Sequence, residues 1–293
     1  MTVVKKRLLL VHAHPDDETI TTGGTIARYV DEGAEVTVLT CTLGEEGEVI
    51  GDRWAGLVAD AADQLGGYRI AELTAALSRL GVSEPRFLLG AGHFRDSGMA
   101  GTPSAANPRA FVNADLDVAV RAVVEVIREL RPHVVITYDT NGGYGHPDHI
   151  QANAITTAAV AAAGTSVYPE AGEPWSPQKF YWTVTERSSL ERGIASIAQV
   201  PAQWRLPEPG ELPCVVDADV TTAIDVSAVL ESKAGALSAH ATQVTVAPSR
   251  TEFALSNNVV QPIVPVEHFV LVRGELGPVD ADGREGDLFG GIS

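Results

Sequence analysis

The residues best suited to chemistry form two short motifs, HPDD at 14–17 and HPDH at 146–149. Imidazole and carboxylate groups are the usual nitrogen and oxygen ligands of catalytic zinc, which keeps three protein ligands and one position for water. In each motif the first and last residues are three apart, so both can point from one turn toward a common site. A polar loop with helix-capping acids is the alternative for either motif alone. Together the motifs favour a metal site with a spare carboxylate that hydrolysis could use as a base.

Both motifs must be positioned by the same kinds of element. An apolar run, 7–11 or 134–138, precedes each motif and is short enough to be a buried strand. A helix is predicted after each motif, over 19–29 and 150–163. The carboxyl ends of parallel strands meet at one edge of a sheet, so the two motifs are expected to face each other across one crevice.

The remaining pattern predicts an α/β fold. We expect a Rossmann-like, mostly parallel sheet with helices on both faces over residues 1–165, and a smaller C-terminal α/β portion over 166–293 that closes the substrate site. Further strands are predicted over 35–41, 85–89, 180–184, 214–216 and 270–272. Further helices are predicted over 57–80, with a break at Gly66-Gly67, and over 115–130, 188–198 and 226–239. A mobile tail is predicted from about residue 277.

Composition excludes several classes of function. The net charge of -17 argues against nucleic acid and anionic membranes as partners, because both reward clustered lysine and arginine. Two cysteines make no disulfide framework. No apolar stretch approaches the ~20 residues of a membrane-spanning helix, and the start lacks the apolar core of a signal peptide. We expect a soluble, cytoplasmic protein whose oligomeric state is unknown.

Longer segments around the motifs resemble one enzyme family. They are TLGEEGEVIGDRW at 42–54, GGYR at 66–69, RDSGM at 95–99 and NGGYGH at 141–146. With the two motifs they resemble the zinc-dependent de-N-acetylases that include the GlcNAc-phosphatidylinositol deacetylases, and among these the mycothiol-pathway branch. The likeness is strongest before residue 165 and returns at AHATQ, 239–243, and LSNN, 255–258. It implies an enzyme that hydrolyses the N-acetyl group of a small glucosamine-inositol pseudo-disaccharide.

The resemblance also implies a metal and a base. It makes His14, Asp17 and His149 the ligands of one Zn²⁺ per subunit. Fe²⁺ is an alternative in the cell, because the same donors suit both ions. Asp16, next to a ligand but not itself one, would be the general base and could later protonate the departing amine.

Further roles follow from the same resemblance. Three groups would act around the reacting carbonyl: His146 stabilising charge near the oxygen, Asp148 orienting the His146 ring, and Tyr144 donating a hydrogen bond to the oxyanion. Four residues fall where the branch contacts sugar and inositol hydroxyls, namely Arg69, Asp96, Met99 and Glu48. The other histidines are expected to be structural: His12, His93, His133, His240 and His268.

Two rival functions stay open on the sequence alone. A sister amidase, which cleaves mycothiol S-conjugates at another amide, would share the ligands and differ only in its loops, where Gly145 is more typical of the deacetylase. A non-catalytic sugar- or nucleotide-binding module is the second rival. Against it, the first strand-helix turn lacks G-x-G-x-x-G and puts acids where a pyrophosphate needs amide donors.

Overall fold

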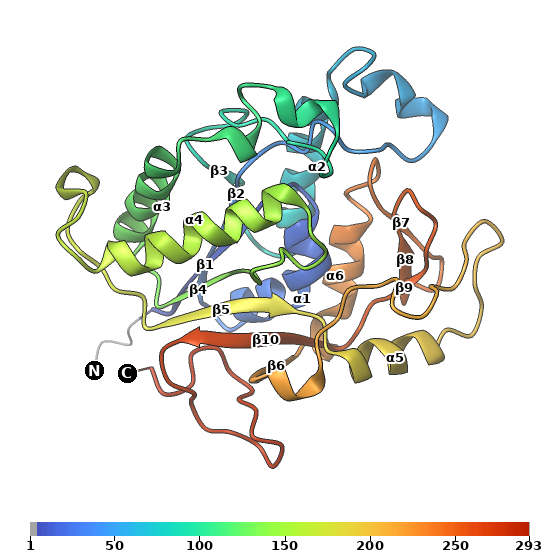
Figure 1. Cartoon of the computed structure of the whole chain (residues 1–293). Helices are drawn as coiled ribbons and strands as arrows, with labels where there is room; N and C mark the ends of the chain where they lie inside the picture. Colours follow the sequence, from blue (N-terminus) through green and yellow to red (C-terminus); the bar gives the residue numbers. More distant parts are fainter. Residues whose placement is uncertain (1–4, 293) are drawn as a thin grey trace.

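The computed structural model describes residues 5–292, and its centre is a seven-stranded sheet (Figure 1). The strand order is β3-β2-β1-β4-β5-β10-β6. The first five strands in this order are parallel, while β10 runs antiparallel to both of its neighbours. The strands are β1 (Arg7–His12), β2 (Glu35–Thr40), β3 (Arg86–Phe87), β4 (Val134–Tyr138), β5 (Lys179–Val184), β6 (Thr222–Asp225) and β10 (Val266–Arg273).

Helices cover both faces of this sheet because β1 is apolar on both. Leu8 and Leu10 pack on one face, and Leu9 and Val11 on the other, as the two-residue period of a strand requires. The first face is covered by α1 (Asp17–Asp31), α2 (Leu65–Arg79) and α6 (Leu230–Leu237). The second face is covered by α3 (Leu116–Leu130) and α4 (Pro147–Ala163). The predicted α/β architecture is confirmed.

A small antiparallel sheet lies beside the carboxyl ends of the central strands, near α6 and α5 (Arg187–Ala195) (Figure 1). Its strands are β7 (Thr245–Val246), β8 (Glu252–Ala254) and β9 (Gln261–Pro262). Among residues 5–292, no helix combines the length and the apolar character needed to cross a lipid bilayer. Both cysteines are free thiols.

The strand order reverses at β1. The chain adds β2 and β3 on one side of β1, and then returns to place β4 and β5 on the other side. In open α/β sheets ligands bind at such a switch point, outside the carboxyl ends of the strands. The 14–17 motif follows β1 and the 146–149 motif follows β4, so both motifs lie at the switch point.

Two sequence predictions need correction. Gly66 and Gly67 do not break a helix, because they lie in the first turn of α2, and residues 52–57 form a separate 3-10 helix. The apolar run at 214–216 forms no strand beyond an isolated bridge at Val215, and the sheet uses β6 instead. The two predicted portions share one sheet, because β5, β6 and β10 all follow residue 165. The boundary near residue 165 stays a prediction.

The segment after residue 277, which we expected to be a mobile tail, packs against the sheet. Leu288 and Phe289 are buried in the same apolar cluster as α1 and α2. Glu285 is also buried, and its carboxylate accepts hydrogen bonds from Lys179 of β5 and Thr222 of β6. Few apolar side chains mark this segment, but those few complete the core.

Candidate metal centre and active site

The 14–17 motif forms a tight turn between β1 and α1. Asp16 is the N-cap residue of α1, and its carbonyl accepts the first helical hydrogen bonds from Thr19 and Ile20. Its backbone has φ 105° and ψ -32°, a conformation that residues with a side chain rarely adopt. Such strain costs on the order of 1–3 kcal/mol and is concentrated at functional sites.

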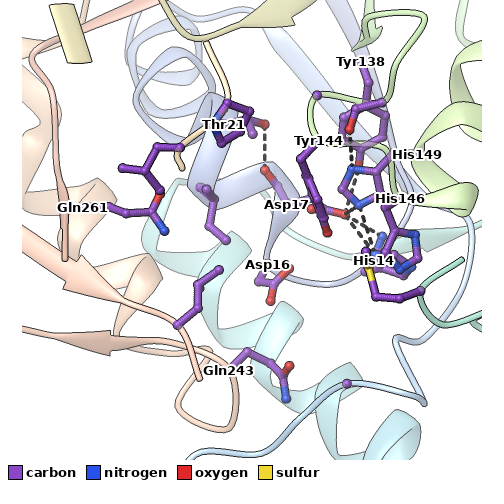
Figure 2. Close-up of a pocket in the computed structure, with 18 of the residues that line it drawn as sticks. His14, Asp16, Asp17, Thr21, Tyr138, Tyr144, His146, His149, Gln243 and Gln261 are labelled. Carbon is purple, nitrogen blue, oxygen red and sulfur yellow. Dashed lines mark hydrogen bonds and ion pairs between the residues drawn. The ribbon is translucent and has the colours of Figure 1, made fainter. Parts of the chain in front are cut away.

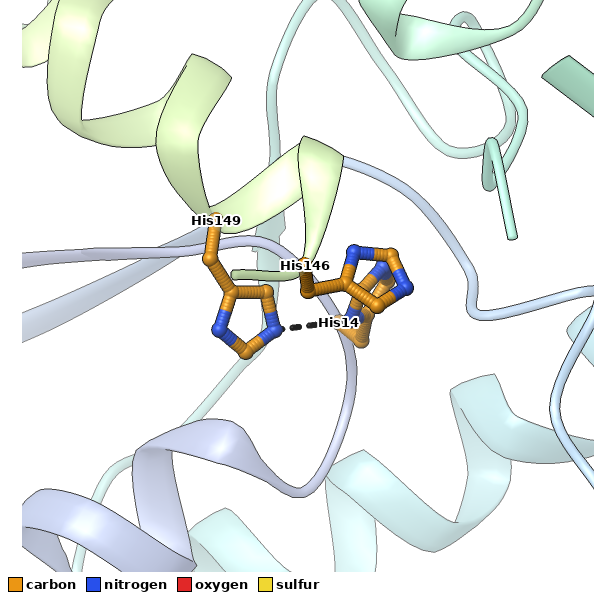
Figure 3. Close-up of side chains that lie close together, drawn as sticks. All are labelled: His14, His146 and His149. Carbon is orange, nitrogen blue, oxygen red and sulfur yellow. Dashed lines mark hydrogen bonds between the residues drawn. The ribbon is translucent and has the colours of Figure 1, made fainter. Parts of the chain in front are cut away.

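Two histidines are oriented by hydrogen bonds on their outer nitrogens. Nε2 of His14 contacts the Asp148 carboxylate at 3.1 Å, and Nδ1 of His149 contacts the carbonyl of Gly142 at 3.1 Å. Each acceptor fixes a proton on the nitrogen that faces it. With those protons in place, the inner nitrogens, Nδ1 of His14 and Nε2 of His149, would supply the lone pairs that a metal ion needs, and they face each other in Figure 3. Burial lowers the pKa of His14, but the carboxylates of Asp96, Asp148 and Asp17 outweigh burial and raise that pKa, so metal binding displaces a proton from the ring.

These inner nitrogens converge with Asp17. Oδ2 of Asp17 lies 3.4 Å from Nδ1 of His14 and 3.3 Å from Nε2 of His149, and the two nitrogens are 3.3 Å apart. Tetrahedral zinc with bonds of ~2.0–2.1 Å separates its ligand atoms by about 3.4 Å. Three such atoms at this spacing repel one another unless protons or a metal cation lie between them. The donor set therefore fits one zinc-like ion, with the ligands implied by the family.

His146 offers a second way to group the imidazoles, because it also lies within 4.8 Å of His14 and His149 (Figure 3). However, its Nδ1 accepts the backbone N–H of Asp148 at 3.1 Å. This leaves the proton on Nε2, since burial and the neighbouring rings of His14 and His149 lower the pKa of His146 to about 4. A neutral ring with an Nε2–H is suited to donate to a developing oxyanion.

Asp148 contacts the His146 ring through its backbone N–H, whereas its carboxylate contacts His14. One carboxylate oxygen, Oδ2, contacts Nε2 of His14 and accepts the N–H of Ser97 at 2.9 Å. Asp148 is fully buried, so it supports a ligand from the outer side of the site. Its backbone N–H holds Nδ1 of His146, and its charge acts to raise the pKa of that ring, against burial and the neighbouring rings.

Asp16 has the properties of a base near neutral pH. Burial raises the pKa of Asp16 to about 6, although the Arg69 guanidinium acts in the opposite direction. Nη2 of Arg69 donates to the Asp16 carboxylate at 3.1 Å and to the carbonyl of Pro15, while its Nη1 donates to Gly44 at 2.7 Å. Figure 2 shows Asp16 beside the cluster of Asp17, His14 and His149.

Two tyrosines flank the metal cluster (Figure 2). Tyr144 is half exposed on the 141–145 loop, and its ring lies edge-on to His149 with centroids 5.0 Å apart. Desolvation in the cleft, with the Asp17 charge, raises the pKa of Tyr144, so the phenol keeps its proton. Tyr138 is buried and stacks on His149 at 4.2 Å.

Tyr138 is a site residue that the sequence analysis missed. Its hydroxyl donates to Oδ2 of Asp17 at 2.7 Å and accepts the N–H of Ala13 at 2.7 Å. As the last residue of β4 it lies beside β1 at the carboxyl edge of the sheet. That position, next to the second motif, was the available signal.

We expect Tyr138→Phe to weaken metal affinity by about 10- to 100-fold, the effect of losing an outer hydrogen bond to a ligand. The phenylalanine ring keeps the stacking on His149, so only the bond to Asp17 is removed. Competition with a chelator measures the affinity. Tyr181→Phe is the matched control, because Tyr181 is also buried but donates to Glu285, away from the site. Equal affinities for Tyr138→Phe and the unmodified protein would contradict the assignment.

The four predicted substrate contacts line one cleft above the metal cluster. The cleft has a volume of about 1320 Å³, more than the ~300–1,000 Å³ of typical ligand sites. Met99 is half exposed, and Glu48 accepts a hydrogen bond from Ser256 at 2.8 Å. Asp96 is buried, with Oδ1 3.5 Å from Nε2 of His14. Arg69 is held by the Pro15–Asp16 turn and by Gly44.

The C-terminal portion supplies further lining residues. Gln243 and Gln261 lie on the cleft wall away from the histidines (Figure 2). His240, which we expected to be structural, is fully buried and contacts Glu18 beside the first motif. The cleft therefore lies between the central sheet and the small antiparallel sheet.

Many known proteins are similar to this chain, and several of them match nearly its whole length. A protein of Rhodococcus erythropolis, named 1D-myo-inositol 2-acetamido-2-deoxy-alpha-D-glucopyranoside deacetylase, is 80% identical over 100% of this chain and 99% of its own length. A protein of the same name from Mycolicibacterium smegmatis is 60% identical over 98% of this chain and 97% of its own length.

A solved structure shares the fold. A conserved protein of Thermus thermophilus is 25% identical, with a TM-score of 0.55 over 92% of this chain and 96% of that protein. Residues 9–160 match the model of the GlcNAc-PI de-N-acetylase family, and this range contains all three predicted metal ligands. The chain is a member of the GlcNAc-PI de-N-acetylase family.

Proposed function

We propose that this protein removes the N-acetyl group of 1D-myo-inositol 2-acetamido-2-deoxy-α-D-glucopyranoside, releasing acetate and the free amine in mycothiol biosynthesis. The reaction is the one for which the full-length relatives at 80% and 60% identity are named. One structural observation carries the chemistry: three lone-pair donors, from His14, Asp17 and His149, converge within 3.4 Å beside the Asp16 carboxylate.

The proposed metal is zinc, with ferrous iron as the alternative, held by His14, Asp17 and His149. When bound, such an ion polarises a carbonyl oxygen and lowers the pKa of a water molecule toward ~7. The contacts with Asp148 and with the Gly142 carbonyl support this assignment, because they hold a proton on the outer nitrogen of each ring and leave the inner nitrogen for the metal ion.

The side chains around the ligands divide the remaining work. Asp16 takes the proton of the attacking water and returns it to the departing amine, a use that suits a carboxyl group with a pKa of about 6. Nε2–H of His146 and the hydroxyl of Tyr144 donate hydrogen bonds to the carbonyl oxygen of the acetamide, which becomes an oxyanion when water attacks the carbonyl carbon. Asp96, Met99 and Glu48 contact the hydroxyl groups of the sugar and the inositol, while Arg69 holds the Pro15–Asp16 turn.

A two-substrate assay tests this function against its nearest rival. Purified, metal-loaded protein is given the N-acetylated pseudo-disaccharide or a mycothiol S-conjugate, and acetate or amine release is measured per bound metal. We expect a large preference for the pseudo-disaccharide. Faster turnover of the S-conjugate would replace the deacetylase by the amidase. A protein purified without stoichiometric metal, and inactive after metal addition, would instead indicate a binding module.

Tyr144→Phe is expected to lower turnover by about 10- to 1000-fold, the range for loss of one oxyanion donor. The metal content should not change, because Tyr144 is not a ligand. Steady-state kinetics with a metal determination on the same sample gives both numbers. Unchanged turnover would remove Tyr144 from the mechanism.

A further inference from the structure

The peptide between Pro15 and Asp16 is held on both sides by buried charged side chains. Its carbonyl oxygen accepts Nη2 of Arg69, and its N–H donates to Oε2 of Glu18 at 2.9 Å. Arg69 and Glu18 are both buried. This peptide is followed by the positive φ of Asp16, a strained backbone conformation. Without the two hydrogen bonds, rotation of the peptide would relieve that strain.

Glu18 is in turn oriented by a residue from the far end of the chain. Nε2 of His240 donates to Oε1 of Glu18 at 2.9 Å, and the hydroxyl of Thr19 donates to the same oxygen. Glu18 and His240 are both 0% exposed. Within the described residues, the other ring nitrogen of His240 has no hydrogen-bond partner, so Glu18 and its neighbour Thr19 are the polar groups that the ring meets.

We propose that Glu18 and His240 are positioning residues for Asp16. This proposal rests on the proposed function, in which Asp16 is the base. Together they hold the N–H of Asp16, and this keeps the carboxylate of Asp16 aimed at the metal centre. If Glu18 is no longer oriented, the buried N–H loses its acceptor, and rotation of the Pro15–Asp16 peptide relieves the positive φ. That rotation carries the Asp16 carboxylate away from the attacking water.

Two substitutions of His240 separate positioning from simple structural support. His240→Leu removes the donor, whereas the side-chain amide of His240→Gln can place an N–H close to the position of Nε2. In the full-length, metal-loaded protein we expect His240→Leu to lower kcat by about 10- to 100-fold, as small misplacements of reacting groups do. We expect KM and metal content to stay unchanged, and His240→Gln to recover most of the lost kcat.

His133→Leu is the matched control. His133 is also buried, and its Nδ1 accepts the N–H of Arg7 at 3.1 Å at the amino end of β4, away from both motifs. It should lower the melting temperature without changing kcat. If His240→Leu fails to fold, Thr19→Val removes one hydrogen bond to Glu18 with little change of shape, and we expect a drop in kcat of about two- to tenfold.

The kinetic outcomes that overturn the proposal are specific. Wild-type kcat in His240→Leu would overturn it, as would wild-type kcat in Thr19→Val if His240→Leu does not fold. Equal kcat values in His240→Gln and His240→Leu would also overturn it, and so would loss of metal from His240→Leu. A crystal structure of His240→Leu gives a reading that does not depend on activity. We expect φ of Asp16 to leave the positive range, and a wild-type φ would reject the proposal. If the unmodified protein deacetylated nothing, the proposed function would fail while this reading still tested the positioning role.

Discussion

Replacing Asp16 with asparagine is expected to lower turnover by about 10²- to 10⁴-fold, the contribution of a general base, while the metal content stays unchanged. Asparagine has nearly the same shape and tolerates a positive φ better than most residues, so the turn is preserved. It cannot accept the proton of the attacking water. Metal analysis and single-substrate kinetics on one preparation measure both quantities.

Asp17→Asn is the second large effect, and it should have the opposite pattern. Asp17 supplies the only negative charge among the three proposed ligands, and its Oδ2 also accepts hydrogen bonds from the N–H of His14 and the hydroxyl of Tyr138. We expect metal affinity to fall by more than the ~10–100-fold that follows loss of an outer hydrogen bond. Activity should fall in proportion to metal occupancy.

The adjacent pair is a stringent test because each substitution is the control for the other. If the Asp16→Asn protein were metal-free and the Asp17→Asn protein metal-loaded, Asp16 would be the metal ligand and Asp17 the general base. Added zinc provides a second check: it should restore part of the activity of Asp17→Asn and none of that of Asp16→Asn.

The arrangement of the two motifs could be predicted because it depends on local order along the chain. Each apolar run is followed by its motif, the first after residues 12–13 and the second after the loop 139–145, and the parallel pairing of β1 and β4 then brings the motifs together. His14 and Asp17 lie in the motif that follows β1, and His149 lies in the motif that follows β4. The period of a buried strand and the donor types were sufficient to predict that the two motifs meet, whereas the choice of these three residues as ligands came from the resemblance to the enzyme family.

Other parts of the site depend on contacts that the sequence does not express locally. Tyr138 reads as the last residue of a buried strand, and only the register of β4 beside β1 brings its hydroxyl to Ala13 and Asp17. Glu18 reads as a helix-capping acid, although its carboxylate meets His240. The contact between the Asp148 carboxylate and His14 was not predicted either, because the sequence does not show toward which histidine that carboxylate points.

The C-terminal portion was harder to predict for a different reason. β6 has four residues at the edge of the sheet, where it pairs with β10, so it carries little periodic signal. The segment after 277 is rich in glycine and polar residues, and its two buried apolar side chains, Leu288 and Phe289, give no helical or strand period. Such elements are specified by the surface on which they pack.

The contact between Glu18 and His240 has a consequence for synthesis of the protein. A ribosome has delivered all three proposed ligands once His149 has emerged, yet the histidine that contacts Glu18 comes about ninety residues later. A nascent chain can therefore bind a cation before His240 is present to orient Glu18 beside Asp16. Hydrolytic activity would then arise only late in translation, and the incomplete polypeptide would have little of it.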